Sequence, residues 1–483
     1  MADTAGRTLL HLAASPVELL TAWGEGGQPG GAATELAPAF AEPLVALNSG
    51  GDPSSRGRWS VLAPIRHHPP LNTLEALRAA LPNTAARPDL LADADAPPFT
   101  GGFIGFISYE FGNVLEPAAG RGTRSATPLP WPNLQFHRCD AALVYDHHRS
   151  QWWAVGSPRE RAVLAQTAAE LSFSAAPPES FVLSPLRSRT GRASFERDVA
   201  RIVEYIRAGD IFQANLAHTL TGRFVGSPRH FFAALMKSAA PWYGAYLDVL
   251  QSTSQPQPRR VICSASPELF VAYQPHTRRV VTRPMKGTVP ANAGETALRE
   301  SEKDRAELNM IIDLMRNDIG RVSAPASVRV DDARAIELHG HGHGIGAASV
   351  YQGVATVSGT LAAGLDVIDL LRATFPAGSI TGAPKIRAMQ VIRELEPADR
   401  GPYCGAIGFI SDSGHAAFSV AIRTALLTSE SSTQGATSAG TLRGTCEYSV
   451  GAGIVADSVP ALEWQETLAK ARIISGLASG GIE

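Results

Sequence analysis

The sequence predicts an α+β fold built on extended β-sheets. Strand and helix segments alternate irregularly along the chain, and no Gly-rich phosphate loop of the dinucleotide-binding or P-loop type occurs. Of the 483 residues, 44% are hydrophobic and 18% are charged, which is typical of a globular protein with a large apolar core. A chain of this length accommodates two or three ordinary domains or one large composite domain.

Charge and cysteine usage exclude several classes of function. The formal net charge is −2 and there is no basic run, so we expect no nucleic-acid partner. No apolar stretch approaches the roughly 20 residues of a transmembrane helix, and the N-terminus lacks the pattern of a signal peptide, so we expect no membrane association. The four cysteines are far apart and unpaired in spacing, which argues against disulfides or zinc and favours a reducing cytoplasm.

Residues 1–175 are predicted to form an N-terminal unit, followed by a Pro/Ser/Arg-rich linker over 176–192. Alternating apolar runs bounded by turn residues predict its strands, and the glycines within 99–110 indicate close approach of another backbone. The expected elements are strands at 59–63 and 99–110, a hairpin of 141–145 with 151–155, and a helix at 159–171.

Residues 193–478 are predicted to form a second region. It opens with a helix over 194–208, whose apolar residues have helical spacing and which ends at Gly209, a favourable C-cap. A Ser/Thr/Gly-rich insertion at 428–440 is expected to be mobile. The expected strands lie at 212–218, 260–265, 405–410, 418–424 and 450–455.

A helix over 301–318 carries the first candidate site residue. Glu307 falls on the predicted apolar face, where a carboxylate is costly unless it is paired, protonated or bound to a cation. The alternative is a glutamate at the surface edge, paired with Lys303 or Arg305. The apolar face is formed by Ala306, Met310, Ile311 and Leu314.

A helix over 458–473, with Pro460 in its first turn, carries the second candidate. Glu466 is predicted to share a face with Leu462, Ala469 and Ile473, and it is flanked by Glu463 and Lys470. Two inward carboxylates on separate helices, with no His or Cys partner, favour a hard cation such as Mg²⁺ and an anionic substrate. The alternative is an ordinary pair of Glu466 with Lys470 on a helix surface.

The stretch 375–392 predicts an anion-binding helix end. Glycine and hydroxyl residues lead into Pro384, and exposed N–H groups at such an end, with Lys385 beside them, suit a carboxylate or phosphate. The alternative is a capped helix without a ligand. Arg423, within the apolar strand at 418–424, needs a buried anionic partner. The His/Gly run at 339–346 matches no metal motif and is interpreted as a surface loop.

Lys286 stands out by residue type. Only five of the 43 basic residues are lysines, and this one lies in a loop framed by Pro284 and Gly287. Arginine cannot lose its proton in a protein, whereas a desolvated lysine can and then acts as a nucleophile. A solvated loop lysine explains this stretch equally well.

Taken together, eight motifs resemble those of the chorismate-utilising enzymes, and within them the aminodeoxychorismate synthases, component I. The resemblance is strong from 194 to 474 and weaker before it. The motifs are AGDIFQANL (208–216), SPE (266–268), RPMKGT (283–288), KDRAE (303–307), DLMRNDIGR (313–321), GSITGAPK (378–385), GAGIVAD (451–457) and QET (465–467).

This resemblance implies large antiparallel sheets packed as a sandwich with helices outside. It makes 1–175 an N-terminal region like that of anthranilate synthase component I, and 193–478 the chorismate-binding catalytic region. It also implies that Glu307 and Glu466, with Glu463 as a third candidate, bind Mg²⁺, which holds the ring carboxylate of chorismate. The implied substrate contacts are Ser379, Thr381, Gly382, Tyr403, Arg423, Gly451, Gly453 and Lys470.

The resemblance also assigns the chemistry. Glu268 is implied as the general acid that helps the 4-hydroxyl leave, and Lys286 as the nucleophile that attacks carbon 2. Ammonia then adds at carbon 4, which gives 4-amino-4-deoxychorismate, the precursor of 4-aminobenzoate for folate. Aminodeoxychorismate synthases carry Lys in this loop, whereas anthranilate synthases usually carry Ala. Mg²⁺ and a nearby Arg283 would disfavour the ammonium form of Lys286.

Three further features bear on this assignment. Gln213 stands where the related isochorismate synthases have a water-activating lysine, which speaks against hydration of the ring. Gln352 replaces a histidine that is frequent in the family. No cysteine lies in a glutaminase-like elbow, so ammonia is expected from a separate glutamine amidotransferase subunit. The competing hypotheses are anthranilate synthase component I and a weakly active chorismate-binding subunit.

Overall fold

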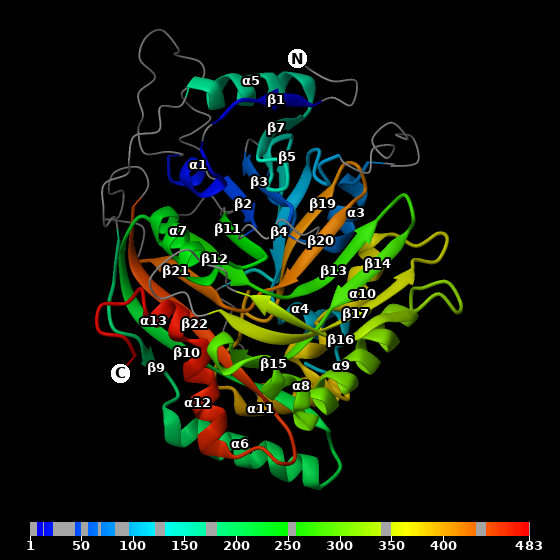
Figure 1. The fold of residues 1–483 in the computed structure, drawn as a ribbon, viewed down its shortest axis with the longest axis vertical. Helices are drawn as coiled ribbons and strands as arrows, with labels where there is room; N and C mark the ends of the chain where they lie inside the picture. The colour runs from blue at the N-terminus through cyan, green and yellow to red at the C-terminus, as the bar shows by residue number, and fades with distance from the viewer. Residues whose placement is uncertain are drawn as a thin grey trace.

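Two large antiparallel sheets with helices on the outside make up the protein (Figure 1). The computed structural model describes residues 7–12, 14–22, 44–49, 57–65, 69–82, 96–120, 131–170, 181–249, 257–339, 349–430 and 441–482. The predicted α+β class and the sandwich of sheets are confirmed.

Sheet A contains strands from both predicted regions. In spatial order it runs β1 (Thr8–Leu10), β7 (Gln151–Gly156), β6 (Ala141–Asp146), β3 (Trp59–Pro64), β2 (Leu44–Asn48), β11 (Tyr243–Val249), β12 (Arg260–Ser266), β21 (Thr424–Ser429), β22 (Leu442–Ile454), β10 (Gln213–Gly226) and β18 (Gly382–Ala383), with β8 (Phe181–Leu183) and β9 (Arg187–Ser188) also on β10.

Sheet B likewise joins both regions. It runs β15 (Met285–Pro290), β17 (Val350–Thr360), β14 (Arg279–Arg283), β13 (Leu269–Gln274), β20 (Ala416–Val420), β19 (Ala406–Ser411), β4 (Gly102–Ile107) and β5 (Leu134–Cys139), with β16 (Arg329–His339) paired to β17.

The helices lie outside these sheets. They are α1 (Pro16–Ala22), α3 (Leu74–Ala80), α4 (Phe111–Leu115), α5 (Pro158–Glu170), α6 (Arg192–Arg207), α7 (Pro228–Ala239), α8 (Thr296–Glu300), α9 (Glu302–Gly320), α10 (Val367–Thr374), α11 (Lys385–Leu395), α12 (Pro460–Lys470) and α13 (Arg472–Ser475), with short 3₁₀ turns at Ala291–Ala293 and Gly378–Ile380.

Apolar side chains of the two sheets form the core between them. Val61 and Ile262 of sheet A belong to the same buried cluster as Ile104 and Ile407 of sheet B. Burying side chains of this size stabilises a fold by about 1.5–3 kcal/mol each. A second cluster packs α9 and α10 on sheet B, and a third joins α6, α11 and α12 to β10 and β22.

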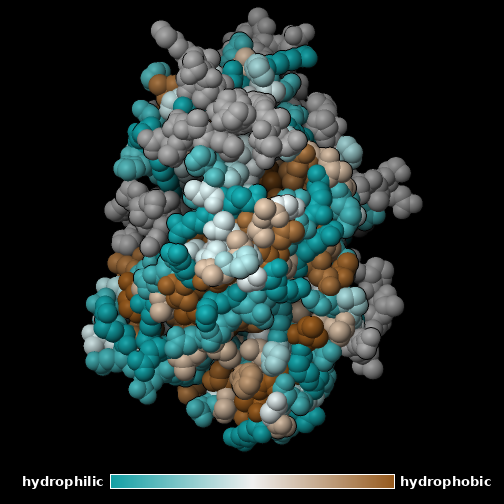
Figure 2. Space-filling view, turned by 90° about the vertical axis from the view of Figure 1, so that its right-hand side faces the viewer, coloured by the Kyte–Doolittle hydropathy of each residue, from teal (hydrophilic) through white to brown (hydrophobic). Residues whose placement is uncertain are grey.

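Helices α6, α11 and α12 gather at one end of the molecule, with α9 beside them at the edge of sheet B (Figure 1). The face on which α9 and β14 lie is mostly hydrophilic, with separate hydrophobic patches (Figure 2). Beneath these helices, β10 and β22 pair over thirteen residues, from Ala214 opposite Ile454 to Gly226 opposite Leu442. This long ladder supports the elements that carry the candidate site.

Most predicted elements are present, with three corrections. The predicted linker 176–192 contributes β8 and β9 to sheet A, where both strands pair with β10. The predicted strand at 418–424 is two strands, β20 and β21, separated by Ala421–Arg423, where Arg423 has a positive φ of 52°. The predicted loop around Lys286 belongs to strand β15, with a bulge between Lys286 and Thr288.

Two predictions on the loops are only partly covered. The insertion at 428–440 lies outside the described residues from 431 onward, and the His/Gly run lies outside them from 340 to 348. His339, the first residue of that run, is not on a surface loop. It is buried at the end of β16, with its ring 4.0 Å from that of Trp242.

The predicted absence of disulfides is confirmed for the four cysteines, which are buried and free at positions 139, 263, 404 and 446. Among the described residues, no helix combines the length and the apolar character needed to cross a membrane.

Candidate active site

The predicted site residues come from both sheets and two helices. Glu268 immediately precedes β13, and Lys286 lies on β15. Facing elements supply further predicted residues: α9 carries Glu307, β22 carries the glycines at 451 and 453, and α12 carries the glutamates at 463 and 466 and Lys470. The sheets therefore contribute the acid and the lysine, and the helices contribute the other carboxylates.

Glu268 is a buried carboxyl group with a specific partner. The Ser379 hydroxyl donates a hydrogen bond to its Oε1 over 2.5 Å. Burial raises the pKa of Glu268 to about 7, against the opposing effects of Ser379 and the nearby cations Lys286, Lys470 and Arg423. A carboxyl group with this pKa is partly protonated near neutral pH, as a general acid requires.

Lys286 projects toward the β22 glycines. A Cβ atom added to Gly453 would lie 2.9 Å from Lys286 Nζ and 2.6 Å from Gln213 Nε2. Glycine at this position therefore gives the lysine and the glutamine room beside β22. The Lys286 side chain is only 13% exposed, and its Nζ lies 3.9 Å from Oε2 of Glu307.

Arg283 has a buried carboxylate partner of its own. Its buried guanidinium donates to Oε1 of Glu337 over 2.6 Å and lies over the ring of Trp242. The charged side chain that pairs with Lys286 is the carboxylate of Glu307. The effect of Arg283 on the charge of Lys286 stays a prediction.

A cluster of alternating charges joins α9 to α12. Lys303 Nζ lies 4.0 Å from Oε1 of Glu307 and 3.8 Å from Oε1 of Glu463. Burial raises the pKa of both glutamates above the usual value, although nearby lysines oppose the shift. Glu463 also accepts a hydrogen bond from the Ser458 hydroxyl over 2.7 Å. Both carboxylates would gain from an added cation.

The predicted inner face of α12 is wrong. Leu462 is 59% exposed, and the Glu466 side chain is 48% exposed. The buried residues of α12 are instead Glu463, Trp464 and Thr467, because Trp464 packs into the core with α6. The carboxylate that α12 turns inward is therefore Glu463.

Glu466 pairs with Lys470 on the outer side of this face. Lys470 Nζ lies 2.7 Å from Oε1 of Glu466 and donates a hydrogen bond to the Gly451 carbonyl over 2.9 Å. Partial burial raises the pKa of Glu466, but the pairing with Lys470 outweighs this effect and leaves the pKa below the usual value. The ordinary helix pair considered from the sequence is thus present.

The predicted face of α9 is also shifted. Ala306 is exposed, and the residues that pack on sheet B are Leu308, Ile311, Ile312, Met315 and Ile319. Glu307 lies at the edge of this face with its side chain 12% exposed. It can therefore reach the site without entering the apolar core.

A hard cation fits the donors that α9 and α12 present. Oε2 of Glu463 is buried and has no hydrogen-bond partner among the described residues. Within the same residues, no three His, Cys, Asp or Glu side chains are grouped as metal ligands. Mg²⁺ commonly uses only one or two carboxylates and completes its shell with water and substrate oxygens. Glu307 and Glu463 fit that pattern better than Glu466 does.

Arg423 supplies a positive charge without a fixed partner. No described residue forms a hydrogen bond or ion pair with its guanidinium, and burial lowers its pKa. Among the described residues, Arg423 forms no ion pair with the buried anionic partner expected from the sequence, although Glu268 lies near enough to act on its charge. An unpaired, half-buried guanidinium is suited to a carboxylate of the substrate.

Tyr403 lies beside the other predicted glycine. A Cβ atom added to Gly451 would lie 3.2 Å from the Tyr403 hydroxyl oxygen and 2.9 Å from the Leu216 carbonyl oxygen. The buried Tyr403 thus reaches β22 only because residue 451 is glycine.

The loop 378–382 presents only part of its predicted polar groups. The Thr381 hydroxyl donates to the Ala377 carbonyl over 3.0 Å, and Gly382 pairs with β10 as part of β18. Lys385 is not free for an anion, because its Nζ donates to Oδ2 of Asp318 over 2.5 Å. From this loop, only the Ser379 side chain bonds to the catalytic candidate Glu268.

Arg400 is a buried residue that sequence reasoning missed. Its guanidinium pairs with Glu396 at 2.6 Å and donates to the carbonyls of Ile380 and Asn215. It therefore ties the loop of Ser379 to β10. The Glu-x-x-x-Arg spacing at 396–400 was the available signal, but surface helix pairs share that spacing.

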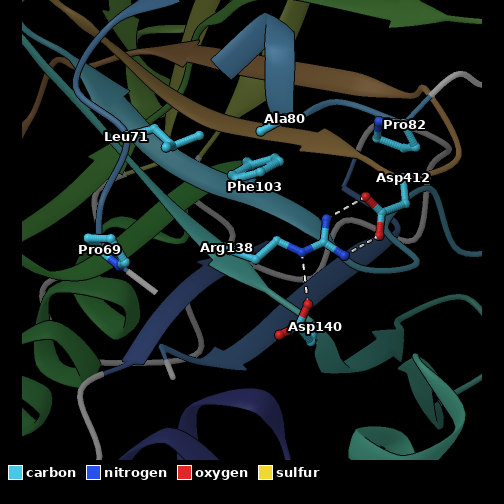
Figure 3. Close-up of a pocket in the computed structure, with 8 residues that line it drawn as sticks. All are labelled: Pro69, Leu71, Ala80, Pro82, Phe103, Arg138, Asp140 and Asp412. Carbon is cyan, nitrogen blue, oxygen red and sulfur yellow. Dashed lines mark hydrogen bonds and ion pairs between the residues drawn. The ribbon is translucent and has the colours of Figure 1, made fainter. Parts of the chain in front are cut away.

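A separate pocket of about 570 Å³ contains none of the predicted site residues (Figure 3). Its charged residue Arg138 pairs with both Asp140 and Asp412. The other lining residues are Pro69, Leu71, Ala80, Pro82 and Phe103. Because these charges satisfy one another, the pocket does not compete with the site above as a place for an anionic substrate.

The chain belongs to the chorismate binding enzyme family, whose model matches residues 50–476. It is 36% identical over 391 residues to an aminodeoxychorismate synthase component 1 of Klebsiella aerogenes, covering 79% of this chain and 78% of that protein. It is 35% identical over 406 residues to an anthranilate synthase component 1 of Streptomyces coelicolor, covering 78% of this chain and 72% of that protein.

Solved structures agree with this assignment. The anthranilate synthase component I of Streptococcus pneumoniae has a TM-score of 0.66 and 28% identity, over 86% of this chain and 91% of that one. The menaquinone-specific isochorismate synthase of Escherichia coli has a TM-score of 0.67 over 98% of this chain and 94% of that one, at 15% identity, which shows the fold alone.

Proposed function

We propose that the protein is component I of an aminodeoxychorismate synthase. It converts chorismate and ammonia to 4-amino-4-deoxychorismate and water, through a covalent adduct on Lys286. One observation carries the proposal: the Lys286 amine projects beside Gly453, in the same site as the buried acid Glu268. An anthranilate synthase needs no lysine nucleophile at this place.

The charges around the site suit a substrate with two carboxylates. Arg423 offers its unpaired guanidinium to the enolpyruvyl carboxylate, together with the Tyr403 hydroxyl. Lys470, held at the Gly451 carbonyl, faces the ring carboxylate. Mg²⁺ bound by Glu307 with Glu463 or Glu466 would supply the additional positive charge that holds that carboxylate.

The first chemical step joins Lys286 to the ring. The neutral amine attacks carbon 2, the two conjugated ring double bonds shift, and the carbon–oxygen bond at position 4 breaks. Glu268 gives its proton to the leaving hydroxyl, which departs as water. The proton lost from the attacking nitrogen restores the acid or passes to solvent.

The second step releases the lysine. Ammonia attacks carbon 4, the two ring double bonds shift back, and the bond from carbon 2 to the Lys286 nitrogen breaks. The proton released from the new C–N bond returns to the lysine amine. The sum is chorismate plus ammonia giving the amino product plus water, with both enzyme groups restored.

Ammonia is supplied in this proposal by a separate glutamine amidotransferase subunit. The relatives named above carry the printed description component 1, which is consistent with a second component. We place the reaction in the reducing cytoplasm, where the four free cysteines are stable, and the product in the route to 4-aminobenzoate and folate.

Anthranilate synthase component I is the second candidate, because relatives of that description match almost as well. The two reactions differ in their products, since anthranilate synthase releases pyruvate and an aromatic acid. Purified protein given chorismate, Mg²⁺ and an ammonium salt should form 4-amino-4-deoxychorismate without pyruvate, as detected by mass spectrometry. Pyruvate and anthranilate formed without an added lyase would overturn the proposal.

The third hypothesis, a weakly active chorismate-binding subunit, rested on Gln352. In the structure, Gln352 is buried on β17 and donates to the Thr288 hydroxyl over 3.2 Å. It therefore joins β17 to the strand of Lys286 rather than leaving a gap there. Turnover with ammonium in the same experiment decides between an enzyme and a binding subunit.

A further inference from the structure

His218 connects strand β10 to helix α12. It is buried, and its ring stacks on Trp464 of α12 with centroids 4.5 Å apart and planes 23° apart. Its Nε2 lies 2.9 Å from the Thr467 hydroxyl, and its Nδ1 lies 3.0 Å from the Ser188 hydroxyl. Phe195 of α6 contacts the ring edge-on. The imidazole is therefore fixed on all sides.

The direction of these hydrogen bonds follows from the hydroxyl groups. The single proton of the Thr467 hydroxyl is donated to the Trp464 carbonyl over 2.7 Å, so Thr467 accepts from Nε2–H of His218. Nδ1 then accepts from Ser188. Burial lowers the pKa of His218 to about 4, so this neutral form persists at neutral pH. His218 is thus a fixed donor to α12.

Thr467 lies in the middle of the helix face that meets the site. Glu463, Thr467 and Lys470 stand at i, i+4 and i+7 on one side of α12. Lys470 is bound to the Gly451 carbonyl of β22, and Thr467 is bound to His218 of β10. Two neighbouring strands therefore hold one helix face, and together they set how far α12 is rotated about its axis.

We propose that His218 is a positioning residue for substrate binding. By holding Thr467, it orients α12 so that Glu463 and Lys470 face the carboxylate-binding side of the site. The inference rests on the proposed function only in that α12 contributes to chorismate binding. It adds a residue that does not touch the substrate.

The test compares five variants with the wild-type protein: four single substitutions and the double variant that combines His218→Leu with Thr467→Val. His218→Leu fills the space with an apolar side chain and removes the Nε2–H donor. Thr467→Val keeps the shape of the side chain and removes the hydroxyl acceptor. His218→Gln restores an N–H near the position of Nε2. Thr219→Val is the matched control, because Thr219 follows His218 on β10 and bonds to Ser449 of β22 rather than to α12.

Two quantities are measured for each variant. One is the dissociation constant of chorismate by titration calorimetry, with Mg²⁺ and without an ammonium salt. The other is the pair of KM for chorismate and kcat with ammonium. Removing a residue that orients binding groups through hydrogen bonds typically lowers affinity or activity by about 10- to 100-fold.

We expect His218→Leu and Thr467→Val each to raise the dissociation constant and KM about tenfold, with kcat within about threefold of wild type. The double variant should be no weaker than the worse single variant, and His218→Gln should recover most of the affinity. Thr219→Val should lower the melting temperature without changing KM.

Equal KM values for Thr467→Val and wild type would overturn the inference, and Thr467→Val keeps the test valid if His218→Leu does not fold. An effect of Thr219→Val as large as that of Thr467→Val would also overturn it, since it would show a general loss of packing. Production of anthranilate by the wild type would instead refute the proposed function, while the KM comparison would still decide the role of His218.

Discussion

The sheet side and the helix side of the candidate site are built differently. Lys286 lies on β15 of sheet B and Glu268 lies directly before β13 of the same sheet; the Lys286 side chain is 13% exposed and Glu268 is only 4% exposed. On the helix side, Glu466 and Lys470 are 48% and 41% exposed, and Lys303 reaches Glu463 only at 3.8 Å. Strand pairing fixes the positions of Glu268 and Lys286. On the helix side, the residues are held by ion pairs and by the hydrogen bond from Lys470 to the Gly451 carbonyl.

This difference separates two tasks. Covalent chemistry needs a nucleophile and an acid held in fixed positions, which a sheet provides. Binding of a charged substrate and a cation needs carboxylates and lysines that can exchange partners. We therefore expect variants on the sheet side to lower kcat and variants on the helix side to change metal and substrate affinity.

The largest effect is expected for Lys286→Ala. Removing the nucleophile should lower ammonia-dependent product formation by at least about 10³-fold, because the covalent route is closed. Mg²⁺-dependent chorismate binding, measured by calorimetry, should survive, since Lys286 is not needed to hold the carboxylates. Lys237→Ala, on the exposed side of α7, is the matched control and should retain wild-type turnover.

Glu268→Gln is expected to lower kcat by about 10²- to 10⁴-fold, because it removes the general acid. In the wild type, kcat should fall as pH rises above about 7, since the acid must be protonated and its pKa is about 7. A flat pH profile in the wild type would contradict this role.

Glu110 offers a control for Glu268. Burial raises its pKa to about 7 as well, but its carboxylate accepts backbone N–H groups of Arg400 and Gly401. Glu110→Gln should therefore lower the melting temperature and leave the pH dependence of kcat in place. The comparison separates a carboxyl group used for chemistry from one used for structure.

On the helix side, Glu307→Gln and Glu463→Gln should raise the Mg²⁺ concentration needed for half-maximal chorismate binding by about 10- to 100-fold. Glu466→Gln should have a smaller effect, because Glu466 is half exposed and paired with Lys470. Glu302→Gln, at the exposed first residue of α9, is the control. An order in which Glu466→Gln is the most damaging would restore the metal pair expected from the sequence.

The smallest effect is expected for Ser379→Ala. The Ser379 hydroxyl stabilises the ionised form of Glu268, so its removal should raise the pKa of that carboxyl group. The fall of kcat with pH should then move to higher pH, by up to about one unit for one hydrogen bond. A pH–rate profile that shifts downward would contradict the assigned hydrogen bond.

The sequence predicted the motifs that form the site better than it predicted which faces of helices α9 and α12 are buried. The motifs at 266–268 and 283–288 combine residue types that rarely occur together in an ordinary loop. The fold brings Glu268 and Lys286 of these motifs into one site. The faces of α9 and α12 were misassigned because helical spacing alone does not show which of two adjacent stripes packs. On α12, Trp464 decided the orientation, since its large ring gains more from burial than Leu462 does.

Other features depended on tertiary contacts that no local pattern contains. The sequence did not show which carboxylate Arg283 would pair with, because its partner Glu337 lies 54 residues further along the chain. His218 lies two residues beyond the 208–216 motif, and its role rests on Ser188 and Thr467, which are 30 and 249 residues away in the sequence.

The central claim is the bond between Lys286 and the substrate. The direct measurement is mass spectrometry of the intact protein, and of its Lys286 peptide, after incubation with chorismate and Mg²⁺ without ammonium. We predict an added mass of chorismate minus water on Lys286, which ammonium discharges as 4-amino-4-deoxychorismate. Formation of that product by Lys286→Ala at the wild-type rate, with no adduct on the wild-type protein, would contradict the account.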